Sequence, residues 1–476
     1  MSSNAHPLSP SHPVKSNRPT LPAIGLTLLA LVIASPAALT TADPDALQRR
    51  IAELEAELAA TRADLAESEA ELVPAKTEPE APTTADAEPA DDKIRFGPLK
   101  VGGAMRVNYI LGDYPGGGNG PPRGGNGGDV ALDTFRINLD LNYQQLIGKA
   151  EYRWYEGYNF IHTGWLGWEF GDGSQLKAGA VPVPFGPGPY GVSQSWFFDQ
   201  HYYVGLADDP DLGLLYSTEL GNWSLDAAYF ISNEWNGNGT SRDSARCTYD
   251  AVVWESAVDA NGNVISALPN GYRERNQLNL RAIYDFGEIA VPTKLGVSLQ
   301  YGELDGRRAD NGHHWAASIH MTNSWNNWLL AAQLTRYRFD ISDNNPLGTD
   351  ELIPMGAYDF AWPVATNAWI PAVSLSYLYE TDGLPWLDSV RPYVEYSSIV
   401  KEDNDFNFND SQMAIVGAAW ARGGGYIYSD LAWSTGNYFV GSKGDNYSQI
   451  DGVGDFGVDG NDEWNFRFNL NLGYYF

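Results

Sequence analysis

The chain ends in the sequence EWNFRFNLNLGYYF, which runs from Glu463 to Phe476. Successive side chains of a β-strand point to opposite faces, so alternate positions share a face. One face here is almost wholly polar, and the other consists of Trp464, Phe466, Phe468, Leu470, Leu472, Tyr474 and Phe476. An α-helix would spread these apolar positions around its circumference. The pattern therefore predicts a strand with one face in lipid and the other in a water-filled lumen.

The composition fits a large all-β chain. Its 476 residues include 50 Gly, 16 Trp and 27 Tyr, as expected for a barrel with aromatic girdles. Its single cysteine, Cys247, excludes an intramolecular disulfide and a multi-cysteine metal site. The formal net charge of −30 argues against a nucleic-acid partner, because such a partner requires a basic surface.

Residues 1–42 have the pattern of a signal peptide. Lys15 and Arg18 precede an apolar run from Leu21 to Ala34, and small residues follow at 40–42. A membrane anchor is the alternative, but the run is shorter than the ~20 residues that a spanning helix needs. We therefore expect export, with the bacterial outer membrane as the destination.

Residues 43–73 are predicted to form an oligomerising coiled coil. Asp43 can cap the helix and Pro44 suits its first turn. Apolar residues with heptad spacing form the seam: Leu47, Ile51, Leu54, Leu58, Leu65 and Leu72. A short coiled coil is stable only on association, so we expect a homotrimer; a single amphipathic helix on a domain surface is the alternative.

Residues 74–93 form a linker rich in proline and acidic residues, which cannot bury a core. It would hold the coiled coil away from the rest of the chain, on the periplasmic side. A tether in which the coiled coil contacts the cell wall is compatible with this arrangement.

Residues 94–476 are predicted to form one transmembrane antiparallel β-barrel. Alternating apolar and polar runs indicate about sixteen strands, near 99–111, 130–142, 147–155, 162–171, 175–184, 211–219, 223–233, 276–286, 293–303, 312–322, 327–339, 370–380, 387–398, 410–420, 425–434 and 464–476. Short glycine-rich turns such as 171–174 and 423–425 follow even-numbered strands, whereas the long connections follow odd-numbered ones. This sidedness is typical of outer-membrane barrels.

The parity of the strands assigns a basic wall to the lumen. A charged side chain facing lipid near the midplane costs about 2–4 kcal/mol for Arg or Lys, so the charged faces must point inward. The predicted pore wall consists of Lys100, Arg106, Arg136, Lys149, Arg153 and Lys177. The inward face of the strand at 327–339 is not assigned by this rule, because Arg336 and Arg338 share parity with apolar residues. A bulge, or a position near the rim, would explain them equally well.

Two segments carry a resemblance to known families. The sequence from Ala180 to Gly186, AVPVPFG, with the later Asp211-Leu212-Gly213, resembles the phosphate-selective porin O/P family. In that family this segment ends a strand and begins a loop that folds into the channel. The coiled-coil prefix resembles trimeric porins of the broader group. The final strand resembles the assembly signal of bacterial outer-membrane barrels, in which Phe476 would be the terminal aromatic residue.

The loop at 185–210 is the predicted constriction. It contains no Lys or Arg, so the resemblance does not carry phosphate selectivity, which requires fixed positive charge at the constriction. The residues predicted to form it are Trp196, Phe197, Phe198, Asp199, Tyr202, Tyr203, Asp208 and Asp209. We hypothesise a transverse field between this acidic, aromatic loop and the basic wall. In the alternative, the wall charges only solvate the lumen and pair with Asp140, Glu151 and Glu169.

These observations favour a porin, a passive channel for ions and small hydrophilic solutes that contacts outer-membrane lipids. The alternative is a substrate-selective channel for organic or inorganic anions, or for sugars, which aromatic side chains can stack against. An enzyme is disfavoured because no nucleophile motif accompanies the histidines. No cofactor or metal is expected; the aspartates at 451, 455, 459 and 462 do not match the EF-hand spacing.

Overall fold

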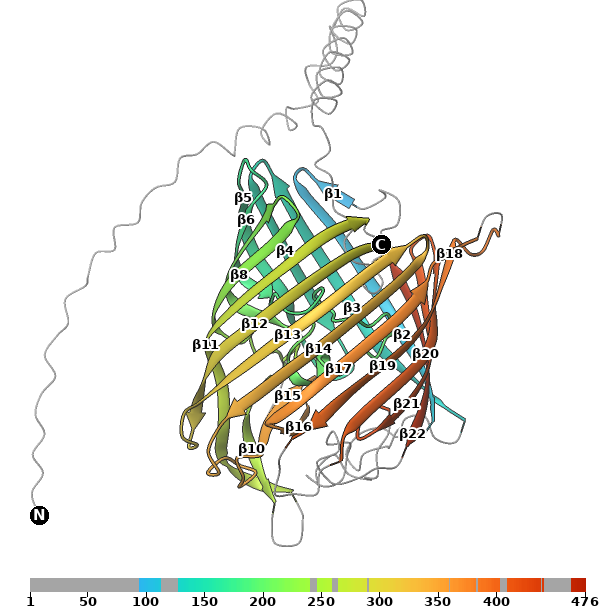
Figure 1. Ribbon diagram of the computed structural model, residues 1–476. Helices are drawn as coiled ribbons and strands as arrows, with labels where there is room; N and C mark the ends of the chain where they lie inside the picture. The colour runs from blue at the N-terminus through green and yellow to red at the C-terminus, as the bar shows by residue number, and fades with distance from the viewer. Residues whose placement is uncertain are drawn as a thin grey trace, which may run out of the picture. The chain divides into compact units, whose positions relative to one another are not determined.

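Sixteen antiparallel strands form a closed barrel in the computed structural model (Figure 1). The structure describes residues 94–112, 127–239, 246–258, 264–288, 291–358, 360–381, 384–402, 409–437, 439–440 and 464–476. The barrel strands are β2 (Leu99–Gly112), β3 (Asp129–Tyr143), β4 (Leu146–Trp154), β5 (Asn159–Glu169), β6 (Gln175–Pro182), β7 (Pro210–Leu220), β8 (Trp223–Ser232), β11 (Val264–Glu288), β12 (Pro292–Arg307), β13 (Gly312–Trp325), β14 (Trp328–Asp340), β17 (Asn367–Tyr377), β19 (Ser389–Lys401), β20 (Ser411–Arg422), β21 (Gly425–Thr435) and β22 (Asn465–Tyr475).

The strand prediction is confirmed, since each predicted span overlaps one barrel strand. The largest difference is at β11, which was expected over 276–286 and is 25 residues long. Its additional N-terminal part pairs with β10 (Val253–Val258) beyond the barrel wall. The predicted signal peptide, coiled coil and linker, which together occupy residues 1–93, lie outside the described residues, as do the seam leucines.

The barrel closes between its first and last strands. β2 pairs with β22 from Ala104 opposite Tyr475 to Gly112 opposite Arg467. Gly103 and Phe476 extend this pairing by exchanging two backbone hydrogen bonds of 2.9 and 3.0 Å. Gly103 is required at this point, because a Cβ atom there would lie 2.6 Å from the Phe476 ring. The last residue of the chain is thus part of the closing ladder.

Short turns connect the strands at one end of the barrel. Between β5 and β6, the Asp172 carboxylate accepts hydrogen bonds from the backbone and hydroxyl of Ser174, and Gly173 adopts φ +82°. This combination is typical of Asx-stabilised turns. Gln144 and Asn326 take left-handed conformations in the β3–β4 and β13–β14 turns. In Figure 1 these turns lie at the upper end, with the C-terminus.

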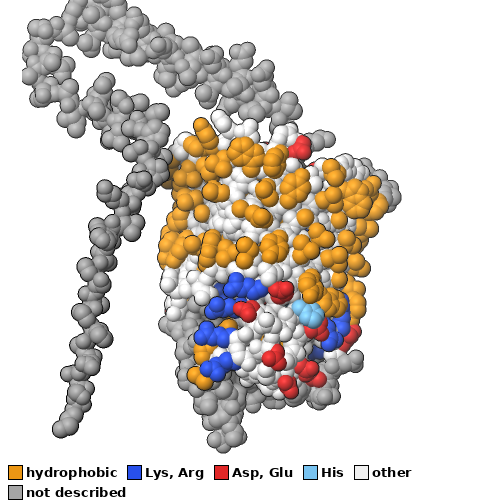
Figure 2. Space-filling model, turned by 90° about the vertical axis from the view of Figure 1, so that its left-hand side faces the viewer, with side chains coloured by type: hydrophobic (Ala, Val, Ile, Leu, Met, Phe, Trp, Pro, Cys, Tyr) orange, Lys and Arg blue, Asp and Glu red, His pale blue; other side chains and the backbone are white. Residues whose placement is uncertain are grey.

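The outer surface of the barrel is apolar over most of its height. Figure 2 shows a broad hydrophobic band on one side of the barrel, with Lys, Arg, Asp and Glu gathered toward the lower end. Exposed members of the band include Leu278, Leu280, Val297, Leu299, Ile319 and Val373. Among the described residues, no helix is long and apolar enough to cross a membrane.

The ambiguity in β14 is resolved by position. Its register with β13 and β17 runs without a shift, so it contains no bulge. Arg336 and Arg338 face outward near the long-loop end of the strand. The Arg336 guanidinium lies 2.6 Å from Glu402 and Arg338 pairs with Asp340, so both charges sit in a polar rim.

The interior holds a hydrophobic core away from the outer surface. A small sheet of β9 (Asp250–Ala251), β15 (Leu352–Ala357) and β16 (Phe360–Ala365) contributes Ile353, Met355 and Val364 to it. A 3-10 helix, η1 (Tyr202–Val204), lies in the same core. Two further short strands, β1 (Ile94–Phe96) and β18 (Tyr379–Glu380), pair antiparallel with β2 and β19.

The apolar band predicts a position-dependent cost for charge. Leu280→Arg places a guanidinium in the middle of the band and should lower the free energy of unfolding in a bilayer by about 2–4 kcal/mol. Leu268→Arg is the matched control, because Leu268 is 65% exposed on the same strand where β11 pairs beyond the barrel wall. Reversible denaturant unfolding in lipid vesicles measures both; equal costs would contradict the assignment of the band.

Candidate functional site

The loop between β6 and β7, residues 183–209, lies inside the barrel and contacts the opposite wall. We call it the inward loop. Its backbone amides donate to side chains of three distant strands: Gly186 to the Ser298 hydroxyl (3.1 Å), Trp196 to Asp430 (3.1 Å) and Gln200 to the Ser397 hydroxyl (3.2 Å). These partners lie on β12, β21 and β19. The loop therefore crosses the lumen instead of covering its mouth.

Glu395 of β19 is a second anchor of the inward loop. Its carboxylate accepts hydrogen bonds from the Ser193 hydroxyl (2.6 Å), the Gln194 amide and the Ser374 hydroxyl (3.0 Å). Arg391, on the same strand, donates to the Gln194 side chain at 3.0 Å. A buried carboxylate with several donors holds its partners firmly, because leaving any of them unpaired is costly.

Asp199 organises the loop from within. Its carboxylate accepts hydrogen bonds from the Val192 amide (2.8 Å), the His201 amide (2.8 Å) and His201 Nδ1 (2.7 Å). Burial alone would raise the pKa of Asp199, but the charge of His201 and these hydrogen bonds hold that pKa below its usual value. His201 Nε2 then lies 2.8 Å from the Thr335 hydroxyl on β14.

The Asp199–His201–Thr335 chain has the residue types of a catalytic relay. All three side chains are nevertheless buried, and none of them lines the two lumen cavities described below. We therefore assign the chain an anchoring role.

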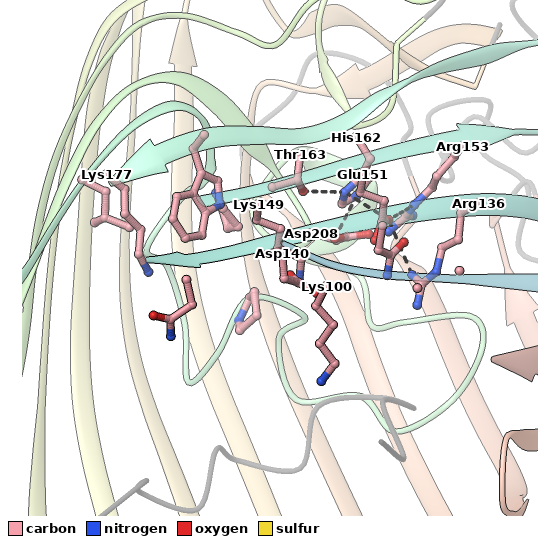
Figure 3. Close-up of a pocket in the computed structure, with 18 of the residues that line it drawn as sticks. Lys100, Arg136, Asp140, Lys149, Glu151, Arg153, His162, Thr163, Lys177 and Asp208 are labelled. Carbon is pink, nitrogen blue, oxygen red and sulfur yellow. Dashed lines mark hydrogen bonds and ion pairs between the residues drawn. The ribbon is translucent and has the colours of Figure 1, made fainter. Parts of the chain in front are cut away.

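The basic wall is carried by β2, β3, β4 and β6 and lines a cavity of about 980 Å³ at the short-turn end (Figure 3). Five of the six predicted wall residues line it: Lys100, Arg136, Lys149, Arg153 and Lys177. Arg95 and Arg281 add two further cations, against the carboxylates of Asp140, Glu151, Asp208 and Asp226. Seven basic side chains thus face four acidic ones.

Ion pairs hold the arginines of the wall in place. Glu151 lies between Arg136 and Arg153, with 3.5 Å to Arg136 and a direct contact to Arg153. Arg106 pairs with Asp133 at 2.7 Å. The Lys177 ammonium lies 4.9 Å from the Trp165 ring centre, a cation–π geometry. Pairing with Glu151 was part of the alternative interpretation of the wall, whereas Asp133 was not identified from the sequence.

Two β-bulges place additional polar groups in the lumen. The β2–β3 register skips Asp133, and the β4–β5 register skips His162. A bulge re-aims the extra side chain, which explains why strand parity did not assign these residues to the wall. His162 lies 3.4 Å from Asp208 of the inward loop and bonds to Thr163 at 2.9 Å (Figure 3).

A second cavity of about 150 Å³ lies on the other side of this contact and is lined largely by aromatic side chains. Trp196, Phe197, Phe198, Tyr202 and Tyr203 line it, together with Arg106 of the wall. The two cavities adjoin, since five residues line both: Arg136, Arg153, Tyr190, Asp208 and Tyr475. Arg136 and Arg153 of β3–β4 and Tyr190 and Asp208 of the inward loop therefore lie where the two cavities meet.

The three aspartates predicted to act together have separate environments. Asp208 lines both cavities and faces the basic wall. Asp199 is turned into the loop toward His201, and Asp209 belongs to a different cluster with Thr248. The loop therefore presents one carboxylate to the wall, where the sequence indicated three.

Several residues of the site were not predicted from the sequence. Tyr190 and Tyr475 line both cavities, and Glu395 and Asp430 anchor the loop. Tyr475 lies on the polar parity of the last strand, and the Arg136 guanidinium lies 5.3 Å from its ring centre. Its place on the polar face of the last strand could have identified Tyr475 as a lumen residue from the sequence. No local signal marks the two anchors, whose partners are about 200 residues away in the chain.

Comparisons with known proteins give structural similarity only. No protein-family model matches the chain, and no curated protein matches it in sequence. Among solved structures, the chain is similar to the outer membrane channel DcaP of Acinetobacter baumannii, with a TM-score of 0.48, 11% identity, and coverage of 79% of this chain and 97% of that one. It is also similar to OmpT of Vibrio cholerae (TM-score 0.47, 11% identity, 81% and 100% covered). A third is the anion-selective porin from Comamonas acidovorans (TM-score 0.46, 11% identity, 79% and 99% covered).

Proposed function

We propose that the protein is a porin of the bacterial outer membrane, a passive water-filled channel whose constriction is formed by the inward loop. The observation that carries this proposal is the pair of adjoining cavities on the two sides of the contact between the inward loop and β3–β4. They lie inside a closed barrel whose outer face is apolar, which suits a lipid environment.

The proposed orientation follows from the lengths of the connections. Short turns and the C-terminus lie at one end of the barrel, and the longer connections lie at the other. In outer-membrane barrels short turns face the periplasm. The larger cavity with the basic wall would therefore be the periplasmic vestibule, and the smaller aromatic cavity would open toward the exterior.

Rigid anchoring supports a constriction instead of a mobile lid. The inward loop is held to the wall by Glu395, Asp430 and Thr335, all of which are buried. The Arg467 guanidinium also lies 4.9 Å from the Trp196 ring centre and 5.1 Å from the Phe197 ring centre. Solutes would pass on the side of the basic wall, where Asp208 and Tyr190 narrow the path.

The charge at this path favours anions over cations. Seven basic and four acidic side chains line the vestibule, although the chain as a whole carries a formal net charge of −30. Local charge at the path outweighs the distant, solvent-screened charge of the loops. We infer a general diffusion channel with an anion preference; a channel specific for an organic or inorganic anion is the second candidate.

The remaining assignments extend this proposal. A signal peptide at 1–42, trimerisation through 43–73 and cell-wall contact by that coiled coil are predictions from the sequence, as is the role of Phe476 in assembly. The aromatic residues of the outer cavity could stack against a sugar, but Phe197 and Tyr203 are almost fully buried within the loop core. Liposome swelling with a size series of sugars and carboxylates tests the channel itself, and saturation would indicate specificity.

Neutralising the vestibule should reduce the anion preference. In Lys149→Gln/Lys177→Gln the channel loses two positive charges, each worth about 0.5 kcal/mol to an anion ~8 Å away in water before screening. The anion-to-cation permeability ratio should fall about two- to fivefold, measured as reversal potential across a planar bilayer under a salt gradient. Arg338→Gln, on the outer rim, is the control and should leave the ratio unchanged. An unaltered ratio in the double variant would refute the anion preference.

Loosening the inward loop should make the current unsteady. Glu395→Ala removes the acceptor for three donors, each hydrogen bond to a charged group being worth about 1.5–3 kcal/mol. We expect frequent current fluctuations in single-channel recordings at constant voltage, because residues 193–195 lose their anchor. Glu380→Ala, which removes an exposed carboxylate on β18, is the control and should show a steady single-channel current. If both variants conduct as steadily as the wild type, the loop does not control the path.

A further inference from the structure

A group of buried carboxylates lies outside the two cavities, where the inward loop rejoins the wall. Asp209, Asp211 and Asp250 each direct a carboxylate oxygen to one place, and these oxygens lie within 4.8 Å of one another. All three side chains are almost completely buried, with exposed fractions of 5%, 1% and 0%. We call these three residues the aspartate cluster.

Two glutamates surround the aspartate cluster. Glu234 Oε1 accepts hydrogen bonds from the amides of Cys247 (3.0 Å) and Thr248 (3.1 Å), and Glu274 Oε1 accepts one from the Ala251 amide (3.0 Å). The Thr248 hydroxyl lies within 3.2 Å of both Asp209 and Glu234. Arg246 supplies a positive charge, 3.2 Å from Asp250. Five buried carboxylates thus face one guanidinium.

Such a concentration of negative charge is unfavourable in the absence of a cation or bound protons. Burial, and then the charges of Glu234 and Glu274, raise the pKa of Asp209 well above its usual value. Burial and the nearby Glu234 raise the pKa of Asp250 in the same way. The repulsion among these carboxylates requires positive charge in addition to that of Arg246, or bound protons.

A buried neutral side chain, Gln277, also contacts the aspartate cluster. Gln277 is 1% exposed, its amide nitrogen donates to Asp211 at 3.1 Å, and its carbonyl oxygen has no hydrogen-bond partner. Gln277 shares strand parity with the buried Asn279, and the intervening Leu278 is exposed, so alternation explains its inward direction. One carboxylate oxygen of Asp211, one of Asp250 and one of Glu234 are likewise buried without a hydrogen-bond partner.

We propose that the aspartate cluster, with the Gln277 carbonyl and Glu234, binds a calcium ion. Calcium takes 6–8 oxygen ligands at 2.3–2.6 Å, so ligands on opposite sides of the ion are separated by about 4.6–5.2 Å. The oxygens of the aspartate cluster lie within 4.8 Å of one another, so their separations do not exceed this span. The unpartnered oxygens supply the remaining ligands.

The donor set favours calcium over other divalent cations. It consists of oxygen atoms, whereas zinc sites use mainly His and Cys ligands. Magnesium retains several waters and uses few protein carboxylates, which does not suit a site with five buried carboxylates. The ion would join three segments: the end of the inward loop at 209–211, the connection that carries Glu234 and Asp250, and the wall strand β11.

The test uses the full-length folded protein in detergent, treated with a chelator and then titrated with Ca²⁺ or Mg²⁺. Isothermal titration calorimetry should detect one tight Ca²⁺ site per chain, and the unfolding temperature should rise on adding Ca²⁺ more than on adding Mg²⁺. Asp211→Asn should weaken Ca²⁺ binding at least tenfold. It should also raise the unfolding temperature of the chelated protein, because it removes part of the repulsion.

Two further variants separate coordination from charge and from loop anchoring. Gln277→Leu removes one neutral ligand and should weaken Ca²⁺ binding without relieving the repulsion. Asp430→Asn alters another buried carboxylate that anchors the inward loop, so it should destabilise the protein yet retain the Ca²⁺ response. The proposal is overturned if the wild type binds no Ca²⁺ stoichiometrically, or if Asp211→Asn binds it as tightly as the wild type.

Discussion

The backbone hydrogen bonds between β2 and β22 constrain everything else in this protein. A lipid-exposed sheet edge would leave a row of unpaired N–H and C=O groups, each costing several kcal/mol, so a sheet in a membrane must close on itself. The closing ladder runs to Phe476, where Gly103 allows the two backbones to meet. Closure fixes which residue of each strand faces inward, and thereby the composition of the lumen.

Within the barrel, buried polar contacts divide the lumen into two parts. On one side the inward loop, the small inner sheet and β19–β21 pack into a core held by Glu395, Asp430 and Thr335. On the other side β2–β4 keep their charged side chains around two cavities. The packed core on the first side forms a fixed boundary for the two cavities on the second side. This division leaves the two cavities beside β2–β4.

The sequence predicted the sixteen strands and the lumen position of the basic residues because both depend on a period of two, which is local. It missed Asp133 and His162 as lumen groups, because a β-bulge breaks that period without a local marker. It also grouped Asp199, Asp208 and Asp209 by proximity in the chain. Their separate environments depend on His201, His162 and Thr248, whose positions are set by tertiary structure.

The anchors of the inward loop also impose an order on assembly. The Trp196 amide bonds to Asp430, 234 residues later in the chain, and Gln200 bonds to Ser397 and Ser411. None of these acceptors is available until the last third of the barrel has formed. Contacts of such long sequence separation form slowly, because the chain entropy of closing the intervening segment is lost first. The inward loop can therefore bond first to Ser298 of β12 and Thr335 of β14, and its anchoring is complete only when β19–β21 are in place.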